Sequence, residues 1–358
     1  MTDSRRILQI CPHDSAPFGD LVNVISTAGA AVDVQVTNVF LGPAANKPIQ
    51  GCEYLDLEDL ADTKVLARAL TPACEEVWDL VLCHRHRAYW GAVRAGVVQE
   101  RCVAIAHEFG MLKSWQRRLG RRWYGRGVHF AGVSKPVAEE LAEVTGHSLV
   151  LPNAIDIQQL RQSRLGRSKA LAELGLSDEG VTVGMVGRLH YKKRPALGLA
   201  AFNAFKADVP KARLVVMGDG PLAGELREQA GADVYFTGNV TNARNYMNAF
   251  DVLVYPAVAD SFGMVVLEAL DAGVPVITEA TSGPAYVLEE MGFYAQGATP
   301  EEYAVALRRG LEKRGLKGDA DIWRSRAQQR VEQLFSVSAM ARMLDHLLIE
   351  GVSGAGWA

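Results

Sequence analysis

The sequence predicts an α/β protein of two domains, each built on a parallel β-sheet. Short apolar runs alternate along the chain with longer stretches of helical periodicity, which is the pattern of buried parallel strands joined by helices. The chain has 358 residues, too many for one ordinary domain. About ten predicted strands divide more naturally into two sheets of about five than into one. The polar segment 158–180, with its charged run RQSRLGRSK, is predicted to join the two halves.

The predicted strands fall into two groups, one on either side of that segment. Helical stretches separate most of them, so we predict Rossmann-like domains over residues 1–165 and 166–335. A last segment, 336–350, has apolar residues at helical spacing and is predicted to pack back on the first domain. The predicted strands are residues 6–11, 32–40, 80–83, 102–106 and 130–133 in the first half, and 181–186, 212–217, 234–236, 252–255 and 274–278 in the second.

The composition and charge exclude several classes of protein. Hydrophobic residues make up 49% of the chain and charged residues 22%, and the net charge of −3 argues against a nucleic-acid-binding protein. No apolar stretch approaches the roughly 20 residues of a spanning helix, and the apolar run before Pro12 is too short for a signal peptide. We therefore expect a cytoplasmic protein. Five cysteines without metal or disulfide spacing are expected to be reduced thiols: Cys11, Cys52, Cys74, Cys83 and Cys102.

The most informative stretch is DVLVYPAVADSFGMVVLEALDAGVPVIT, residues 251–278. A buried strand ends at Pro256, and a helix is predicted to start near Gly263, which lets a ligand approach the backbone closely. Free amide groups at a helix start suit a phosphate or an array of hydroxyl groups. The residues at this helix start are Ser261, Phe262, Gly263, Met264 and Val265.

Two carboxylates flank this helix start. Asp260 stands just before the helix, and Glu268 lies eight positions later among apolar residues, where a carboxylate is costly without a partner. Two carboxylates so placed are expected to hold two separate sets of sugar hydroxyl groups. The alternative is that Asp260 caps the helix and Glu268 is a solvated helix residue.

A second string, VGMVGRLHYKKRP, places two cations after a strand. The strand runs into Gly187, followed by Arg188 and, five positions on, Lys193. A planar guanidinium and a point charge near a departing diphosphate would stabilise its negative charge as a metal ion would. The alternative is a basic surface loop. The neighbouring Lys192 and Arg194 are expected to be solvated.

These two blocks together resemble the family-4 retaining glycosyltransferases. The family signature E-G-F-G-x-x-x-x-E-A-x-A-x-G-x-P-V is similar to D-S-F-G-M-V-V-L-E-A-L-D-A-G-V-P-V here, with Asp260 in place of the first glutamate, and the family's G-R-L-x-x-x-K matches the second block. The resemblance implies that Glu268 binds the nucleotide ribose and that Asp260 and the following amides hold the sugar. It also implies the GT-B fold, in which two Rossmann-like domains face each other across a cleft.

Two further positions in the second half carry the resemblance. The string LVVMGDGPLAG places Gly218 where the family has x-x-G-x-G-P, a position that supports the donor site. Val240, after YFTGN, matches the place where the family's backbone passes the nucleotide base. The glycines also nearly match a dinucleotide fingerprint, but the last one comes one residue late, so a nucleotide-dependent oxidoreductase is the weaker alternative.

The first half adds a glycine and three histidines. Gly19, in the loop-like string DSAPFGD, is expected either to approach the donor phosphate or to form an ordinary turn. His107 follows the strand CVAIA and matches the family's histidine that contacts the donor sugar. His84 and His86 resemble the family's H-x-H and stay open between a structural and a functional role. A zinc site is not expected, because further ligands are lacking.

The segment LKSWQRRLGRRWYGR is basic and amphipathic at helical spacing. Its apolar face would carry Leu112 and Leu119 with two tryptophans, and its basic face would include Lys113. Such a helix suits an anionic membrane surface, and bacterial lipid-acceptor transferases of the resembled family often carry a comparable segment. The alternative is that the tryptophans face the core. The residues expected to contact the membrane are Trp115, Arg117, Arg118, Arg121, Arg122 and Trp123.

The sequence therefore predicts transfer of a hexosyl unit, with retention, from a nucleoside diphosphate sugar to a hydroxyl of a saccharide or lipid-linked saccharide, such as a lipopolysaccharide core. A non-catalytic sugar-nucleotide-binding relative is the alternative. The protein would be cytoplasmic, with peripheral contact at the inner face of the cytoplasmic membrane. We expect no nucleic acid partner, no cofactor and no metal, and interpret the one D-x-D string, 319–321, as a surface loop. The candidate catalytic residues are His107, Arg188, Lys193 and Asp260.

Overall fold

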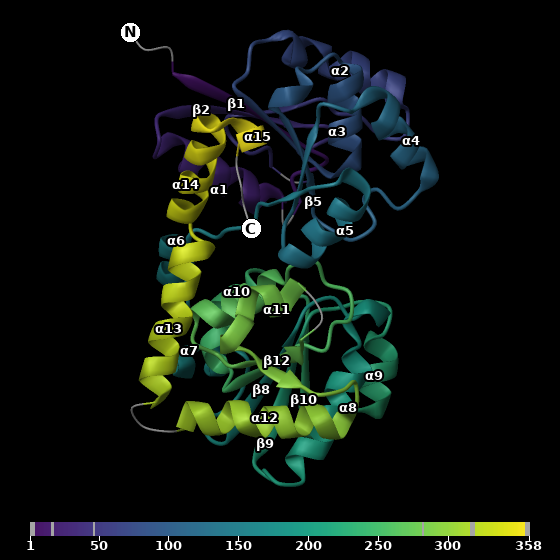
Figure 1. Cartoon of the computed structure of the whole chain (residues 1–358). Helices are drawn as coiled ribbons and strands as arrows, with labels where there is room; N and C mark the ends of the chain where they lie inside the picture. Colours follow the sequence, from purple (N-terminus) through teal and green to yellow (C-terminus); the bar gives the residue numbers. More distant parts are fainter. Residues whose placement is uncertain (1–3, 16–17, 46, 281–282, 316–318, 355–358) are drawn as a thin grey trace. The chain divides into compact units, whose positions relative to one another are not determined.

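The computed structural model describes residues 4–15, 18–45, 47–280, 283–315 and 319–354 (Figure 1). The chain forms two compact units, residues 1–156 with 333–358 and residues 157–332. The boundary lies before helix α6 (Ile157–Ser163), whereas the sequence placed it after residue 165. The reason is that this helix and its following loop belong to the second unit, where the amide of Leu165 donates to the carbonyl of Asn245 at 2.9 Å.

The first unit contains a sheet of seven parallel strands in the order β3-β2-β1-β4-β5-β6-β7. The order reverses between β1 and β4, so the connections on the two sides cover opposite faces of the sheet. The strands are β1 (Arg5–Cys11), β2 (Val34–Phe40), β3 (Cys52–Tyr54), β4 (Leu80–His84), β5 (Cys102–Ala106), β6 (His129–Gly132) and β7 (Leu149–Val150). The helices are α1 (Phe18–Ala30), α2 (Thr63–Glu75), α3 (Arg85–Arg94), η1 (Gln99–Arg101), α4 (Trp115–Tyr124), α5 (Lys135–Thr145), α14 (Val337–Ile349) and α15 (Gly351–Gly354).

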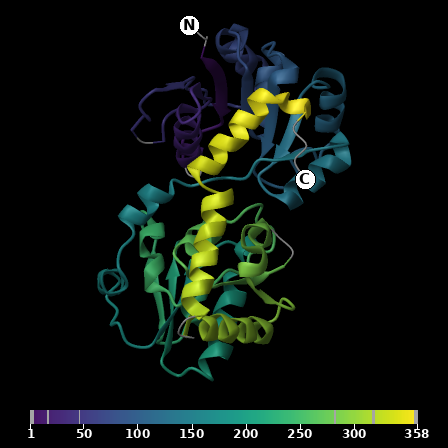
Figure 2. The ribbon, with the colours of Figure 1, turned by 60° about the vertical axis from the view of Figure 1, so that its left-hand side comes forward.

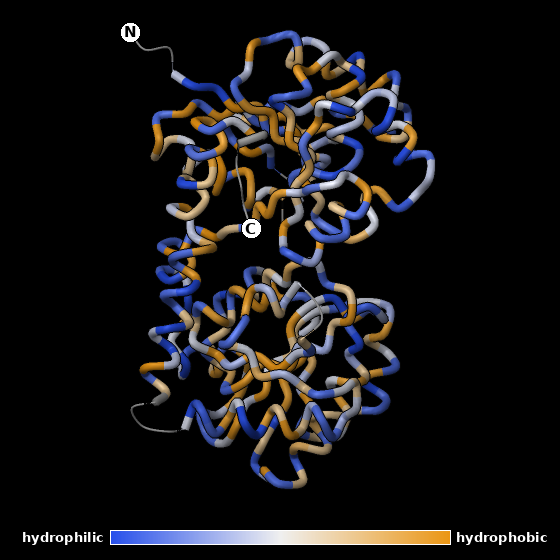
Figure 3. The backbone as a smooth tube through the Cα atoms, in the orientation of Figure 1, coloured by the Kyte–Doolittle hydropathy of each residue, from blue (hydrophilic) through white to orange (hydrophobic). Residues whose placement is uncertain are grey.

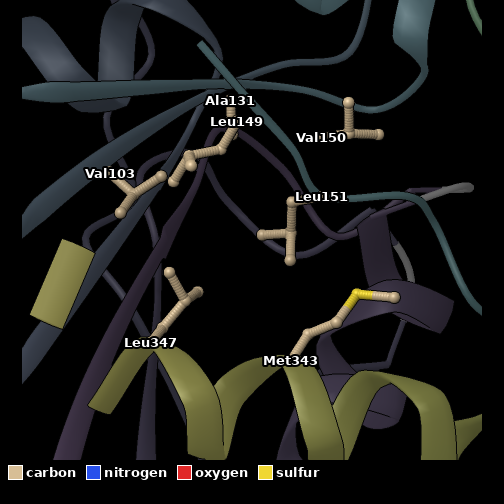
Figure 4. A pocket seen from close by; sticks show the side chains of 7 residues that line it. All are labelled: Val103, Ala131, Leu149, Val150, Leu151, Met343 and Leu347. Carbon is tan, nitrogen blue, oxygen red and sulfur yellow. The ribbon is translucent and has the colours of Figure 1, made fainter. Parts of the chain in front are cut away.

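Helix α14 returns to the first unit at the end of the chain and lies beside α1 (Figures 1 and 2). Its side chains Met343 and Leu347 line a small apolar hollow with Leu149 and Leu151, next to the end of the sheet (Figure 4). The hydroxyl oxygen of Ser336 caps the helix by accepting from the amide of Ala339 at 3.0 Å. The C-terminal segment therefore completes the first unit through apolar packing and a capped helix start.

The second unit repeats the same topology with six parallel strands, in the order β10-β9-β8-β11-β12-β13. Its order reverses between β8 and β11, and α8 packs along α12 (Figure 1). The strands are β8 (Val181–Val186), β9 (Ala212–Met217), β10 (Val234–Gly238), β11 (Val252–Val254), β12 (Val276–Glu279) and β13 (Phe293–Ala295). The helices are α6, α7 (Arg167–Glu173), η2 (Tyr191–Lys193), α8 (Pro195–Lys206), α9 (Ala223–Gln229), η3 (Ala243–Ala249), α10 (Met264–Asp271), α11 (Gly283–Leu288), η4 (Glu289–Met291), α12 (Pro300–Gly315) and α13 (Asp319–Leu334).

The strands that the sequence missed all lie at sheet edges. β3, β7 and β13 have only two or three residues each, so they carry no long apolar run, and the sheets have seven and six strands rather than five. The central strands β5, β8 and β9 have the bounds that were predicted, because they are mostly apolar and buried. Figure 3 shows that hydrophobic backbone gathers in the middle of each unit. In the described part of the chain, no helix combines the length and the apolar character that crossing a membrane requires. All five cysteines are free thiols.

Candidate functional site

The predicted donor residues of the second unit gather at the carboxyl ends of β8 and β11. These two strands are neighbours at the point where the strand order reverses. The connections leave this point toward opposite faces of the sheet, which opens a crevice where α/β proteins bind ligands. A hollow at this edge is lined by Gly187, Arg188 and Lys193 from the β8–α8 connection and by Tyr255 and Pro256 after β11. The two predicted cations therefore share one site.

The glycines after β8 and β9 let two loops touch backbone to backbone. A Cβ atom on Gly218 would come within 2.1 Å of the carbonyl oxygen of Gly187, and one on Gly220 within 2.5 Å of that of Leu189. Gly187 itself has a φ of 138° and open space where a side chain would point. Its amide already donates to Met217 at 2.9 Å. Gly218 thus supports the site by close packing, and Gly187 leaves room in front of it.

Lys193 and Asp260, predicted to bind different parts of a donor, are bonded to each other. The Lys193 Nζ atom lies 2.5 Å from the Asp260 Oδ2 atom and donates to the Tyr255 hydroxyl at 2.7 Å. The Tyr255 hydroxyl in turn donates to the same carboxylate. The Asp260 side chain is 14% exposed and that of Lys193 33% exposed. An ammonium, a phenol and a carboxylate therefore form one partly buried cluster.

Protonation states in this cluster follow from its geometry. Burial alone would raise the pKa of Asp260, but the charge of Lys193 and hydrogen bonds from Lys193, Tyr255 and the Phe262 amide hold it below its usual value. Burial, followed by the charge of Asp260, raises the pKa of Tyr255 well above its usual value. Glu268 contributes to the same shift, so its carboxylate lies within electrostatic reach of Tyr255. The cluster thus links the β8–α8 connection, residues 187–194, which we call the cation loop, to helix α10.

Helix α10 begins with open amide groups beside this cluster. Gly263, with a φ of 87° and a ψ of 69°, precedes the helix in a left-handed conformation that favours glycine. The amides of Gly263, Met264 and Val265 donate to no group in the described part of the chain. The amide of Phe262 was predicted to be free, which is wrong: it donates to the Asp260 Oδ1 atom at 3.2 Å. Three backbone donors remain for a ligand.

The loop before α10 is held by a glycine of the next helix. The amide of Gly283 donates to the carbonyl oxygen of Asp260 at 2.9 Å. A Cβ atom on Gly283 would come within 2.1 Å of the carbonyl group of Ser261. Only a glycine permits this approach, so the start of α11 fixes the position of the residues that precede α10.

The two arginines of the cation loop have different environments. Arg188 is exposed and makes no ion pair or side-chain hydrogen bond with the residues that the structure describes. Arg194 was expected to be solvated, which is wrong. Its Nε atom donates to the carbonyl of Pro256 at 2.6 Å, and its guanidinium pairs with the partly buried carboxylate of Glu279. Arg194 therefore ties the β8–α8 connection to the loop after β11, and Arg188 is available to a ligand.

Val240 lies at the same edge of the second sheet. It is half-buried in the loop that follows β10, whose last residue, Gly238, accepts a hydrogen bond from the amide of Gly218 at 2.8 Å. The structure thus places Val240 beside the loops that carry Gly187 and Gly218. A nucleotide base at this position would contact the backbone rather than a charged side chain.

In the first unit, His107 forms a buried pair with His84. The His84 Nδ1 atom lies 2.8 Å from the His107 Nε2 atom, and Phe18 makes an edge contact with the His107 ring at 4.9 Å between centroids. Burial lowers the pKa of His84 to about 3 and, together with the charges of His84 and Arg85, lowers that of His107 far below its usual value. Both rings are neutral at pH 7, so the pair positions His107 rather than supplying a positive charge.

Gly19 is not part of a loop, which corrects the prediction for this residue. It lies in the first turn of α1, and a Cβ atom there would come within 2.5 Å of the carbonyl oxygen of Asp14. Its missing side chain lets the preceding connection cross close to the helix. Gly19 therefore has a packing role in the first unit.

Helix α4 exposes its apolar face and turns several arginines inward. Trp115 is 69% exposed and Trp123 68% exposed, so the expectation that tryptophans might pack in the core fails. Arg117 donates to the carbonyl of Met111 at 3.0 Å, and Arg121 to that of Thr145 at 3.3 Å. Both half-buried arginines thus bond their own unit, and the membrane contact predicted for them stays a prediction. Arg118 is exposed but donates to Leu112, which is buried before the helix, and Arg122 is exposed.

The D-x-D string does not form a loop. Helix α13 begins at Asp319, so Asp321 lies in its first turn, where a carboxylate interacts favourably with the helix dipole. Among the described residues, no group of three or more histidine, cysteine, aspartate or glutamate side chains is placed to hold a metal ion.

Three residues that matter at the site were missed by sequence reasoning. Tyr255 ends an apolar strand run and was counted as a strand residue, although a hydroxyl at the carboxyl end of a central strand is a recognisable signal. Gly283 and Arg194 act through contacts distant in sequence, and only the glycine in the string SGP hinted at a close backbone approach.

Two doubly wound parallel sheets, with a cation-lined edge on the second, define the architecture of the GT-B glycosyltransferases. Residues 180–313 match the family model described as Glycosyl transferases group 1, so the second unit carries a domain of this group. The match covers the cation loop, the Tyr255–Asp260 segment and helix α10.

The chain is also similar in sequence to curated proteins named as glycosyltransferases or glycolipid synthases. The chain is 29% identical over 271 residues to a D-inositol 3-phosphate glycosyltransferase of Geodermatophilus obscurus, covering 64% of this chain and 60% of that protein. It is 29% identical over 138 residues to an alpha-monoglucosyldiacylglycerol synthase of Streptococcus pneumoniae, covering 36% of this chain and 31% of that protein. The chain thus spans less than two thirds of the length of these relatives.

Solved structures show the same fold over nearly the whole chain. Anabaena Alr3699/HepE, in complex with UDP and glucose, superposes with a TM-score of 0.75 at 18% identity, covering 97% of this chain and 100% of that one. WaaG, a glycosyltransferase involved in lipopolysaccharide biosynthesis, superposes with a TM-score of 0.69 at 16% identity, covering 96% and 100%. These likenesses establish the GT-B fold.

Proposed function

We propose that this protein transfers a hexosyl unit from a nucleoside diphosphate sugar to a hydroxyl group of a saccharide or lipid-linked saccharide, with retention of configuration. The observation that carries the proposal is the shared site of Arg188, Lys193, Tyr255 and Asp260 beside the open amides of α10. It is supported by the group 1 domain match over residues 180–313 and by the UDP bound in the Anabaena neighbour.

The donor diphosphate is proposed to bind at the cation loop and the start of α10. Arg188 offers a planar fork of donors that has no partner among the described residues, and Lys193 offers a point charge. Charge that develops on the departing phosphate would meet groups already in place, so little reorganisation is needed. No metal is required for this stabilisation.

The sugar and ribose are proposed to bind on the acidic side of the site. Asp260 would accept sugar hydroxyl groups once Lys193 turns toward the phosphate, and Glu268 would accept the ribose hydroxyl groups. Tyr255 stays protonated and keeps donating to Asp260, so the carboxylate stays ionised. In the retaining route that we propose, the departing phosphate helps to take the proton of the acceptor hydroxyl, and no side-chain nucleophile is needed.

A panel of donors tests this assignment. UDP-, GDP- and ADP-sugars are added to the full chain, and the midpoint of thermal unfolding is measured, since a ligand that binds the folded state raises it by mass action. We expect one nucleotide class to raise the midpoint and Glu268→Ala to abolish the rise. Glu312→Ala is the matched control, because Glu312 is exposed near the end of α12. A rise that survives Glu268→Ala overturns the ribose assignment.

A lipid-linked acceptor is proposed from the surface of α4. Trp115, Leu119 and Trp123 follow one another at four-residue spacing and are 69%, 45% and 68% exposed, with the exposed Arg118 and Arg122 beside them. Such a row buries aromatic surface in a membrane interface, and the cations attract anionic headgroups. The likeness to WaaG supports a lipopolysaccharide acceptor. The protein would then work at the inner face of the cytoplasmic membrane.

Vesicle sedimentation tests the membrane contact. We expect the chain to bind phosphatidylglycerol vesicles more strongly than phosphatidylcholine vesicles, and less strongly as salt rises. Replacing Trp115 and Trp123 together by serine should lower binding at least about tenfold, because two interfacial aromatic side chains are lost. Ile322→Ser removes another hydrophobic side chain, 61% exposed on α13, and should leave binding unchanged. Equal binding by the double variant and the wild type argues against this surface.

Two rival functions make different predictions. A non-catalytic sugar-nucleotide-binding relative would show the thermal shift but release no nucleoside diphosphate from any donor. A nucleotide-dependent oxidoreductase would need the glycines after β9 to face a dinucleotide, but Gly218 and Gly220 pack against the backbone of Gly187 and Leu189. Release of UDP, GDP or ADP on adding donors supports transfer, and bound-cofactor fluorescence on adding NADH would support the oxidoreductase.

A further inference from the structure

A second hollow lies in the first unit. It opens at the carboxyl ends of β4 and β5, between the start of α3 and the connection from β5 to α4. Its cavity volume is about 290 Å³, and it is open to solvent on one side. The polar side chains that line it are those of Arg85, His86, Arg87, His107, Glu108 and Arg117.

The guanidinium groups of this hollow are incompletely satisfied. Arg87 is half-buried and has no ion pair or side-chain hydrogen bond among the described residues. The Nε atom of Arg85 is buried without a hydrogen-bond partner among the described residues, and its Nη1 atom forms a long ion pair of 3.7 Å with the Oε1 atom of Glu108. Arg117 has one hydrogen bond, to the carbonyl of Met111. A partly buried guanidinium without partners is costly, so an anion in this hollow would be favourable.

The charges in the hollow add up to a positive site. Glu108 is the only acidic side chain among the lining residues, and it is largely exposed. Burial and the charges of Arg117 and Arg87 lower the pKa of His86 to about 4, so His86 is neutral at pH 7. Arg87 and Arg117 line the hollow together with His86. Three positive charges against one negative charge suit a dianion, and the positive end of the α3 dipole adds to the attraction.

We propose that this hollow binds a phosphate monoester carried by the acceptor saccharide. Arg87 and Arg85 would bind the phosphate oxygens in a planar, bidentate manner, with Arg117 as the third cation. His107 lines the same hollow, so a phosphate bound there would lie beside its ring. The assignment rests on the proposed function and names the chemical class of its acceptor.

The test is a thermal-shift titration of the full chain at constant ionic strength. The probes are inorganic phosphate, D-glucose 6-phosphate, D-glucuronate and D-glucose. We expect the two phosphates to raise the unfolding midpoint, and glucose to leave it unchanged. Arg87→Gln should require at least about tenfold more glucose 6-phosphate for the same rise, since one charge-assisted contact is lost. Arg87→Lys, which keeps the charge but not the fork, should fall in between. Arg68→Gln, which changes an exposed arginine on α2, is the control.

Several outcomes overturn the assignment. No rise with glucose 6-phosphate, or an equal rise in Arg87→Gln and wild type, removes the site, and an equal response to glucuronate removes the phosphate assignment. UDP-sugar titrations run in parallel separate this proposal from the donor assignment. If Arg87→Gln also loses the UDP-sugar rise, the hollow holds donor phosphate instead. If no nucleotide sugar acts on the wild type but glucose 6-phosphate does, the phosphate site stands and the proposed transferase function falls.

Discussion

Replacing Asp260 by asparagine tests the charged cluster of the second unit most sharply. The substitution keeps the shape of the side chain but removes its charge. One of its two oxygen atoms becomes an NH2 group, so it can no longer accept from Lys193 and Tyr255 on one oxygen and from the Phe262 amide on the other. Lys193 would lose its counter-ion and turn toward solvent or toward a bound phosphate. Stability should therefore fall, whereas the binding of UDP without sugar should not.

The magnitude follows from burial and hydrogen bonding. Hydrogen bonds to a charged group contribute roughly 1.5–3 kcal/mol each, but Lys193 is 33% exposed, so solvent screens part of its interaction. We expect Asp260→Asn to lower the free energy of unfolding by about 2 kcal/mol at pH 7. For a unit of this size that corresponds to a fall of about 4–8 °C in the unfolding midpoint. Turnover should fall by roughly 100-fold or more, and UDP without sugar should bind at least as tightly as to wild type.

The stability that Asp260 contributes should depend on pH. The pKa of Asp260 is lower in the folded than in the unfolded state, so its stabilising contribution is present at pH 7 and is lost as pH falls through the folded value. The stability difference between wild type and Asp260→Asn should therefore shrink below about pH 4. Urea unfolding of both proteins at pH 7 and pH 3.5 measures this difference. Equal stability of the two proteins at pH 7, or unchanged turnover, would contradict the proposed roles of the Asp260 carboxylate.

Three further changes probe the fold around both sites. Arg194→Ala should lower the free energy of unfolding by about 2 kcal/mol, because Glu279 loses its partly buried partner. Urea unfolding that shows no loss would contradict the stabilising role of the Arg194 contacts to Glu279 and Pro256. Gly218→Ala should cost about 3 kcal/mol or more, since its Cβ would come within 2.1 Å of a backbone oxygen, whereas Gly224→Ala in α9 meets open space and should be neutral or stabilising by thermal unfolding. His84→Gln should reduce the loss of stability at low pH. As pH falls from 6.5 to about 3, the free energy of unfolding of the wild type should fall by about 1.4 kcal/mol per pH unit through this residue, because only the unfolded state takes up the proton. Equal dependence of the unfolding free energy on pH in wild type and variant would count against this role.

The fold could be predicted from the sequence to the extent that its central strands are continuous apolar runs. β5, β8 and β9 have the predicted bounds because each lies inside its sheet and is buried on both faces. The edge strands β3, β7 and β13 pair on one side only, so two or three residues suffice and no periodic signal remains in the sequence. The edge strand β10 was found because it has five residues, so strand length together with position in the sheet decided which strands were found.

The residues of the site could be predicted from the sequence, but the hydrogen bonds and ion pairs between them could not. We predicted from the sequence that Arg188, Lys193 and Asp260 share one site, and the structure places them at one edge of the second sheet. The direct bond between Lys193 and Asp260 was missed, because side-chain pairing across loops that are 67 positions apart leaves no local pattern. The capture of the Phe262 amide by Asp260 is a local turn, and it was overlooked because the helix start was assumed to be open.

Helix α4 shows a further limit of periodicity. Helical spacing identified an apolar row and a basic row but could not say which row faces the protein. Gly120 decides this in the structure, because its Cα lies against the ring of Trp90, where a Cβ would come within 2.5 Å. The side of the helix that carries this glycine is the side that packs, so Trp115 and Trp123 point to solvent. A glycine inside an amphipathic helix is thus a usable signal for its buried face.

Nucleoside diphosphate release is the measurement that bears most directly on a sugar-diphosphate site in the second unit. The full chain is incubated with UDP-, GDP- and ADP-hexoses without added acceptor, so that slow transfer to water is followed. Our account predicts release from one nucleotide class and a fall of roughly 100-fold or more in Arg188→Ala, with Glu312→Ala unchanged. Release at the wild-type rate by Arg188→Ala, or no release from any of these donors, would contradict it.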